Sequence, residues 1–189
     1  MRDLASSSQT ALKWANKAQA ICSETKGVGA EKAGELVKRW FADEDTTDED
    51  IAKYKKTLAE GFKKIAVAAS SARLIFTDNP IDRGGEFEES EAYVWGDRLN
   101  VVYIESDFFG HENLLSGPTN WARIVVHELS HLKLNTVDVP GRYAWGGIMP
   151  HKGGFPASKA ITNADSWAWF CADCNSALTE KNRLDALKK

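Results

Sequence analysis

The amino-acid sequence predicts an α+β domain whose N-terminal half is mostly helical. Apolar residues recur at helical spacing through residues 7–75. Two strands are expected at 92–95 and 99–104, because apolar and polar residues alternate on both sides of Gly96-Asp97, as they do in a β-hairpin. A further helical pattern at about 119–132 follows this hairpin, so helices and a small sheet share one chain.

The N-terminal half is expected to form three helices. The first spans about residues 8–23, and the second follows the turn at 25–27. The acidic run at 43–50 is a loop to which we assign no function, and Thr47 or Asp48 can cap the third helix. The apolar positions of the second and third helices are Ala33, Leu36, Val37, Trp40 and Phe41, then Ile51, Tyr54, Leu58 and Phe62.

The second half is expected to contain two helices separated by a long loop. A loop-like segment at 78–90 leads to the hairpin. After a Ser-Gly-Pro turn, Thr119 or Asn120 can cap a helix. Residues 135–163 are rich in Gly and Pro and read as a loop, and the last helix is expected at about 164–184. The apolar positions of the helix after the turn are Trp121, Ile124, Val125, Leu129 and Leu132.

The composition excludes some classes of function. The formal net charge is −3 and the sequence pI is about 5.8, so no basic surface is available for a phosphate backbone, and we expect no nucleic-acid partner. The N-terminus lacks the apolar core of a signal peptide, and no stretch approaches the roughly 20 apolar residues of a membrane span. We expect no membrane segment, and a protein that is secreted or exported without a visible signal peptide, or otherwise cytoplasmic.

The cysteines carry little functional information. Their number is odd, so a full disulfide framework is excluded while one bridge stays open. The C-x-x-C pair resembles half a zinc ribbon, but no second pair provides the remaining ligands. For this pair we favour two small apolar residues on a helix, since free cysteine packs as a buried apolar residue. The three residues are Cys22, Cys171 and Cys174.

The segment HELSH at 127–131 is the strongest functional signal. On a helix, His127 and His131 lie one turn apart on one face, so both rings can bind one metal ion at about 2.0–2.1 Å. Glu128 then lies beside the metal, where it can take a proton from an attacking water whose pKa zinc lowers to about 7. The apolar spacing predicts the helix independently of the motif, which favours a zinc site over a surface helix with solvated histidines.

A catalytic zinc ion needs a third protein ligand. The motif with a third histidine is excluded, because Leu134 and Val137 stand where it requires Gly and His. The next glutamate, Glu180, lies in the charged tail. We favour Asp138, since a tight turn can fold it back onto the metal seven residues after His131. The candidates considered are Asp138, His151, Asp165 and Asp173.

Four segments together resemble one protein family. They are HELSH, N-T-V-D at 135–138, Y-A-W-G at 143–146 and N-A-D-S-W-A-W-F at 163–170, and an apolar segment at 101–109 precedes them as a strand. The family is that of the aspzincin metallopeptidases, the group of deuterolysin and the fungal peptidyl-Lys metalloendopeptidases. The resemblance covers roughly residues 100–175. It implies a zincin-like metalloprotease domain with an HExxH active-site helix and zinc as the cofactor.

The resemblance also implies roles for single residues. Glu128 would be the general base. Tyr143 would donate a hydrogen bond to the oxyanion, although a literal overlay of the tyrosine motif places Trp145 there, and a packing role for Tyr143 stays open. Asp165 would bind a substrate lysine or, as an alternative, favour the start of its helix. Ala168 replaces a glutamate of the lysine-specific members, which weakens the lysine preference. The implied zinc ligands are His127, His131 and Asp138.

We therefore predict a zinc-dependent metalloendopeptidase with Glu128 as general base and lysine next to the scissile bond as the implied, weakened preference. A single domain is expected over residues 1–189, with a helical part at 1–75 and a zinc-site part at 92–180. Its partners would be protein or peptide substrates, and it would be monomeric. One alternative is a non-catalytic zinc-binding or interaction domain, against which the intact Glu128 argues. A secreted bacterial effector or toxin protease would use the same chemistry.

Overall fold

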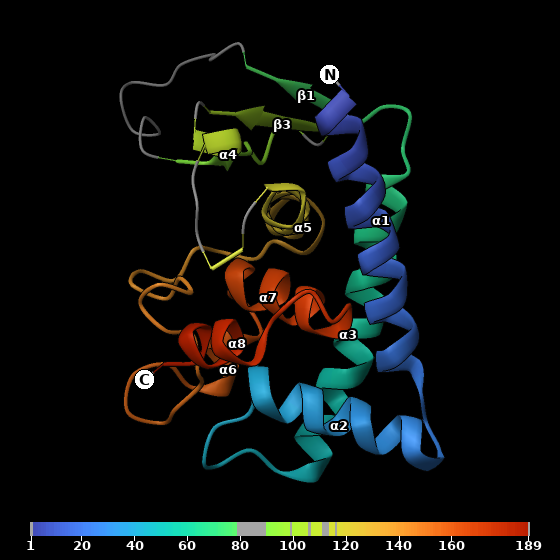
Figure 1. Ribbon diagram of the computed structural model, residues 1–189. Coiled ribbons are helices and arrows are strands. Elements are labelled where there is room, and N and C mark those ends of the chain that lie inside the picture. The colour runs from blue at the N-terminus through green and yellow to red at the C-terminus, as the bar shows by residue number, and fades with distance from the viewer. Residues whose placement is uncertain are drawn as a thin grey trace.

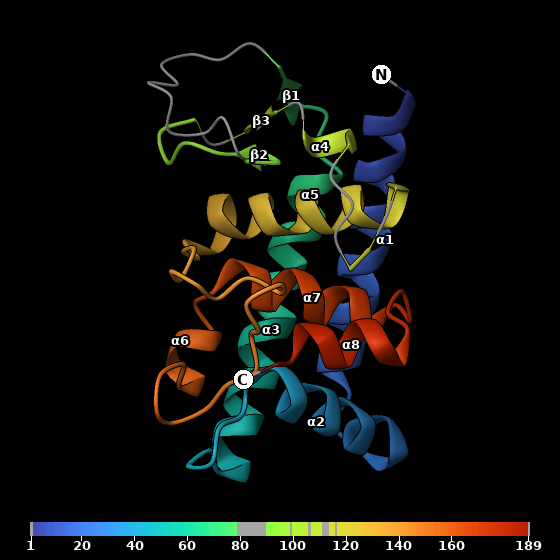
Figure 2. The ribbon, with the colours of Figure 1, turned by 60° about the vertical axis from the view of Figure 1, so that its left-hand side comes forward.

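Three helices form the N-terminal half of the chain, as predicted. The structure is a computed structural model that describes residues 2–78, 90–98, 100–105, 107–110, 114–115 and 117–188. The three helices are α1 (Arg2–Ser23), α2 (Gly27–Phe41) and α3 (Asp48–Ala69). α1 begins before the predicted start near residue 8, and it runs beside α3 along one side of the molecule (Figures 1 and 2). α2 packs at the end farthest from the sheet (Figure 1).

Thr47 is the N-cap of α3, which decides between the two predicted caps. The Thr47 hydroxyl accepts a hydrogen bond from the Asp50 N–H at 3.2 Å, and the Asp50 carboxylate accepts one from the Thr47 N–H at 3.1 Å. This reciprocal pair is a capping box. The acidic loop before it is also tied to a distant segment, because the Asp43 carboxylate accepts a hydrogen bond from the Ala157 N–H at 2.8 Å.

The described strands form one three-stranded sheet with the order β1-β3-β2. They are β1 (Ile75–Thr77), β2 (Ala92–Tyr93) and β3 (Val101–Ile104). β2 and β3 are antiparallel, which confirms the predicted hairpin, although both strands are shorter than predicted. β1 runs parallel to β3 and was not predicted, because three residues are too few to show an alternation. Residues 79–89 of the predicted loop lie outside the described residues.

α5 (Gly117–Leu134) crosses the middle of the molecule, with the sheet on one side and the C-terminal helices on the other (Figures 1 and 2). The predicted caps Thr119 and Asn120 are wrong, because the helix begins at Gly117 and both lie inside its first turn. Gly117 adopts a left-handed φ of 51°. Pro118 fits the first turn, since an N–H there would have no partner within the helix.

The prediction of one last helix at 164–184 is wrong, because the chain forms two helices there. α7 (Ala164–Cys174) ends in a turn where Ser176 has a left-handed φ of 57°. Thr179 then caps α8 (Glu180–Ala186) by accepting a backbone hydrogen bond. Every residue of α7 is buried, as expected for a helix that is apolar on nearly all sides.

The hydrophobic core joins both halves of the chain. Phe41 of α2 and Phe62 of α3 pack against Trp167 and Phe170 of α7, with ring centroids 5.1 to 6.4 Å apart. The three cysteines are free and buried in this core, which confirms the prediction for the C-x-x-C pair, Cys171 and Cys174. Burial raises the pKa of Cys22 to about 12.

Within the described ranges, two short helices interrupt connecting segments. α4 (Asp107–Gly110) follows β3, and α6 (Ala157–Ala160) lies within the predicted loop at 135–163. None of the helices in the described part of the chain is long and apolar enough to cross a bilayer.

Candidate metal centre

α5 carries His127 and His131 one helical turn apart, and both side chains line the same cavity. The Nε2 atoms of the two rings are 3.1 Å apart, and the ring planes meet at 78°. Two imidazole nitrogens at this separation can bind one cation between them, as the spacing of four residues on a helix predicts.

Asp138 is folded back onto these rings by the chain that follows α5. Asn135 adopts a left-handed φ of 54° directly after the helix and so reverses the chain. Val137 then bridges to the segment before α7. The Val137 N–H donates to the Thr162 carbonyl at 2.9 Å, and the Val137 carbonyl accepts from the Ala164 N–H at 3.1 Å. These two hydrogen bonds fix the backbone immediately before Asp138.

Asn163 holds the backbone after Asp138 in the same way. The Asn163 amide oxygen accepts a hydrogen bond from the Val139 N–H at 3.1 Å, and its amide nitrogen donates to the Arg142 carbonyl at 3.1 Å. Asn163 itself is 1% exposed. Asn163 opens one of the four segments that resemble the family, but its backbone partners lie more than twenty positions away along the chain and could not be predicted.

The three side chains form a donor set that suits zinc. One Asp138 carboxylate oxygen lies 3.1 Å from His127 Nε2 and the other lies 3.4 Å from His131 Nε2. Zinc bonds of about 2.0–2.1 Å in a tetrahedron place neighbouring donors about 3.4 Å apart. Among the residues that the structure describes, no other group of three His, Cys, Asp or Glu comes as close together.

The outer nitrogen of each histidine is also held. Asp165 Oδ1 lies 3.1 Å from His127 Nδ1, and the Thr136 carbonyl oxygen lies 2.7 Å from His131 Nδ1. Thr136 is positioned by Ser130, whose hydroxyl lies 2.7 Å from the Thr136 hydroxyl. Acceptors at both Nδ1 atoms favour the tautomer that leaves Nε2 free to bind a metal.

Without a metal, His127 is a cation that pairs with the Asp138 carboxylate. Burial would lower the pKa of His127, but hydrogen bonds to Asp138 and Asp165 outweigh burial and raise this pKa to about 10. Burial would raise the pKa of Asp138, yet the two histidines hold it well below its usual range. Because zinc binds the unprotonated imidazole, metal binding is expected to release the His127 proton.

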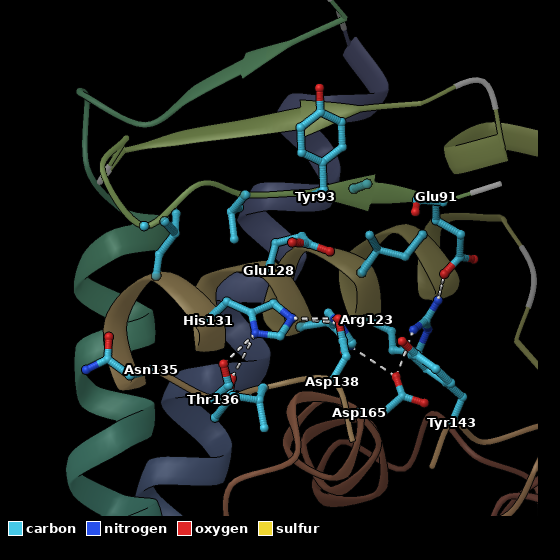
Figure 3. A pocket seen from close by; sticks show the side chains of 18 of the residues that line it. Glu91, Tyr93, Arg123, Glu128, His131, Asn135, Thr136, Asp138, Tyr143 and Asp165 are labelled. Atoms are coloured by element: carbon cyan, nitrogen blue, oxygen red, sulfur yellow. Dashed lines mark hydrogen bonds and ion pairs between the residues drawn. The ribbon is translucent and has the colours of Figure 1, made fainter. Parts of the chain in front are cut away.

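Glu128 lies beside the three candidate ligands and is not one of them. Its carboxylate lies on the side of α5 that faces the sheet, below the strand that carries Tyr93 (Figure 3). Glu128 lines the cavity and is only 4% exposed, and burial raises its pKa although His127 and His131 oppose the shift. A raised pKa suits a carboxylate that must accept a proton and return it.

Tyr143 and Trp145 line the same cavity from the loop before α6. Their rings stack with centroids 4.4 Å apart and planes within 5°. Trp145 is 63% exposed, whereas Tyr143 is half-buried. Burial, followed by the charges of Asp138, Asp165 and Glu128, raises the pKa of Tyr143 to about 12. The phenol therefore keeps its proton at neutral pH and can donate a hydrogen bond.

Arg123 is a cavity residue that the sequence reasoning missed. It lies one turn before His127, and its side chain, 4% exposed, forms ion pairs with Glu91 and Asp165 (Figure 3). A signal was present, because an arginine inside the apolar run at 121–126 needs a buried partner. Glu91 offered no signal, since its contact with Arg123 depends on how the sheet meets α5.

The other residues considered from the sequence are not among the three candidate ligands. His151 pairs with Phe155 in an isolated β-bridge. Asp173 accepts hydrogen bonds from the arginines of other helices and from Trp40. Asp165 is 2% exposed and bound to His127, and its role in binding substrate stays a prediction. Ala168 is fully buried and is not among the described residues that line the cavity.

Fold and site together define a class of protein. It is an α+β domain that can hold a zinc ion between two histidines of an HExxH segment and a later aspartate. A family profile described as lysine-specific metallo-endopeptidase, that of the aspzincins, matches residues 27–172. The chain therefore belongs to the aspzincin family of zinc metalloendopeptidases, which confirms the resemblance and zinc as the metal the family uses. No curated protein with which the sequence was compared matches it.

The family match reaches further toward the N-terminus than the sequence motifs did. The motifs covered roughly residues 100–175, whereas the match begins at residue 27, the first residue of α2. α2 and α3 are therefore part of the matched region.

Proposed function

We propose that the protein is a zinc-dependent endopeptidase that hydrolyses peptide bonds with Glu128 as the general base. The observation that carries the proposal is that Glu128 and the three candidate ligands line one cavity of about 1160 Å³. Membership of a family of zinc metalloendopeptidases supports the same reaction. In this proposal the domain is zincin-like and α5 is its active-site helix.

The zinc ligands in this proposal are His127, His131 and Asp138. Three protein ligands leave one position of a tetrahedron open, which is the arrangement of catalytic zinc sites. Bound there, zinc supplies a Lewis acid that polarises the scissile carbonyl and makes water more acidic. The contacts of Asp165 and the Thr136 carbonyl orient the two imidazoles for this task.

Glu128 and Tyr143 carry the proton and charge chemistry. Glu128 accepts the proton of the attacking water and passes it to the leaving amine. Tyr143 donates its phenol O–H to the oxyanion that develops on the scissile carbonyl oxygen. Trp145 stacks on the Tyr143 ring. We propose that this stacking helps to hold the phenol as a donor before the reaction.

The substrate is proposed to be an extended peptide that lies along β2. β2 is the last strand in the order that the described strands form, and Ala92, Tyr93 and Val94 line the cavity. Extended peptides can add to a sheet as a further strand through main-chain hydrogen bonds. Such a strand would pass over Glu128, which faces the sheet (Figure 3).

We further propose that residues 1–189 form a single catalytic domain. The packing of Phe41 and Phe62 against α7 supports this, because the helix that begins beside the site is covered by α2 and α3. Deletion of residues 1–45 is expected to give an insoluble product. A folded and active product would instead identify this segment as dispensable.

We also propose an oligomeric state and a place of action for the protein. The protein is proposed to be a monomer, which size-exclusion chromatography with light scattering tests. It is proposed to act after secretion or export, in the manner of an effector or toxin protease, and recovery of the tagged protein from the medium of its native host tests this.

The central experiment compares the wild type with Glu128→Ala on a denatured protein substrate, with the zinc content of both samples measured. Cleavage by the wild type alone, at equal zinc content, is the expected result. Bound zinc without cleavage by the wild type would favour the non-catalytic zinc-binding domain. Equal cleavage by both samples would show that Glu128 is not the base.

A further inference from the structure

Arg123 occupies one end of the cavity, between Glu91 at the sheet and Asp165 on α7 (Figure 3). The guanidinium donates to a Glu91 carboxylate oxygen through Nη2 and to Asp165 Oδ1 at 3.4 Å through Nη1. Its Nε donates to the Asn120 side-chain oxygen at 2.8 Å. The guanidinium carbon also lies 5.6 Å from the centre of the Trp169 ring. These contacts on several sides fix the cation in place.

The two carboxylates beside Arg123 are already engaged. Asp165 Oδ1 contacts His127 and Arg123, and Asp165 Oδ2 accepts from the Ala144 N–H at 2.9 Å. Glu91 Oε1 accepts from the Asn120 amide at 3.0 Å, and its other oxygen accepts from Arg123. Each of the four carboxylate oxygens therefore has a donor from the protein itself.

This arrangement disfavours charged substrate side chains at this end of the cavity. A lysine ammonium would have to displace Arg123 from a carboxylate or lie beside a like charge that is nearly excluded from water. A substrate carboxylate would meet Glu91 and Asp165 as like charges. The same cavity is also lined by the apolar side chains of Val94 and Ile124. An uncharged side chain meets neither obstacle.

We propose that Arg123 is a specificity-determining residue, which pairs with both carboxylates at this end of the cavity and directs the enzyme toward an uncharged residue next to the scissile bond. The inference rests on the proposed peptidase function and narrows its substrate class. It departs from the lysine specificity in the description of the family.

The test uses peptides that differ at one position. Two otherwise identical peptides carry lysine or norleucine on the C-terminal side of one scissile bond, and a second pair carries them on the N-terminal side. Norleucine has the stem of lysine without the ammonium, so the kcat/KM ratio isolates the charge. For at least one pair, the wild type is expected to cleave the norleucine peptide at least about tenfold more efficiently.

The variant Arg123→Met removes the guanidinium and keeps an unbranched side chain. Its norleucine-to-lysine ratio is expected to fall by at least about tenfold, because Glu91 and Asp165 lose the cation between them. Arg39→Met is the matched control, since Arg39 also pairs with a buried carboxylate of α7, Asp173, outside the residues that line the cavity. Its ratio is expected to equal that of the wild type.

A second variant covers the case in which Arg123→Met does not fold. Glu91→Gln removes one acidic group and keeps Arg123, so it is expected to increase the preference for norleucine over lysine. Absence of the tenfold preference for norleucine in both pairs, whether the two peptides are cleaved equally or lysine is preferred, would overturn the proposal. An unchanged ratio in folded Arg123→Met, or in Glu91→Gln, would overturn it as well.

The outcome also separates this inference from the peptidase function. Lysine-selective cleavage by the wild type overturns the role of Arg123 and leaves the peptidase intact. Failure of the zinc-loaded wild type to cleave either the peptides or a denatured protein overturns the peptidase function and, with it, the role of Arg123.

Discussion

α7 carries two buried carboxylates, Asp165 near its start and Asp173 about two turns later. They are 2% and 6% exposed, and each binds arginine. Asp165 faces the cavity, where it contacts His127 Nδ1 at 3.1 Å and Arg123. Asp173 is not among the described residues that line the cavity, and it ties neighbouring helices together.

The contacts of Asp173 show what the second carboxylate does. It accepts hydrogen bonds from Arg39 and Trp40 of α2 at 2.8 and 2.9 Å, and from Arg183 of α8 at 2.9 Å. The same residue type on one helix therefore serves the candidate site at one end and the assembly of helices at the other. The partners of a buried charge, and not its burial, distinguish the two uses.

The largest effect on stability is expected from Asp173→Asn. Removing one partner of a buried ion pair costs roughly 3–5 kcal/mol, and the lower end applies because Arg39 and Arg183 stay partly exposed, at 38% and 26%. Urea denaturation measures the loss. Zinc affinity of the folded variant is expected to match that of the wild type. A zinc affinity that falls together with stability would show that Asp173 also supports the metal site, and would contradict distinct roles for the two carboxylates.

The matched change at the other carboxylate is Asp165→Asn. An amide N–H in place of the Asp165 acceptor favours the His127 tautomer that carries its proton on Nε2, which cannot bind a metal. Zinc affinity is expected to fall by about 10- to 100-fold, the range for loss of such an outer partner. Competition with a chelator measures it. Equal zinc affinities for Asp165→Asn and Asp173→Asn would show that Asp165 contributes no more to zinc binding than Asp173 does.

Gly61→Ala probes the part of α7 between the two carboxylates. A methyl group at Gly61 of α3 would overlap the Trp167 ring, which is held by the hydrogen bond from its Nε1 to the Ile161 carbonyl at 2.8 Å. Overpacking of this kind costs about 1–3 kcal/mol in unfolding free energy, measured by urea denaturation. Gly34→Ala is the control. It lies in α2 with open space around it and is expected to be neutral or to stabilise by up to about 1 kcal/mol.

The smallest effect is expected from Thr47→Ala, which removes the cap of α3 far from both carboxylates. Loss of a capping side chain costs about 1 kcal/mol. Thermal unfolding measures it, and zinc affinity is expected to stay unchanged. A cost larger than that of Asp173→Asn would show that the local cap matters more than the buried ion pairs.

Features set by neighbours in sequence could be predicted. The capping box at Thr47 depends on residues three positions apart, and the hairpin of β2 and β3 depends on alternation near one turn. The convergence of His127 and His131 follows from helix geometry alone. The short distance of Asp138 from the motif along the chain favours it as the third ligand, and the structure places it against the His127 and His131 rings.

Features set by distant contacts could not be predicted. The break between α7 and α8 depends on a left-handed Ser176, which neither Gly nor Pro marks. The contacts of Glu91 with Arg123, and of Asp165 with His127, join residues more than thirty positions apart. The sequence shows that a charged side chain is present. Which side chain it pairs with depends on how the sheet, α5 and α7 pack together.

The most direct test of the metal site is a crystal structure of the zinc-loaded protein with anomalous diffraction measured on both sides of the zinc absorption edge. The expected result is one zinc peak, about 2.0–2.2 Å from His127 Nε2, His131 Nε2 and an Asp138 carboxylate oxygen, with Asp165 still on His127 Nδ1. A zinc ion bound directly by Asp165, or no peak between the two histidines, would contradict the account.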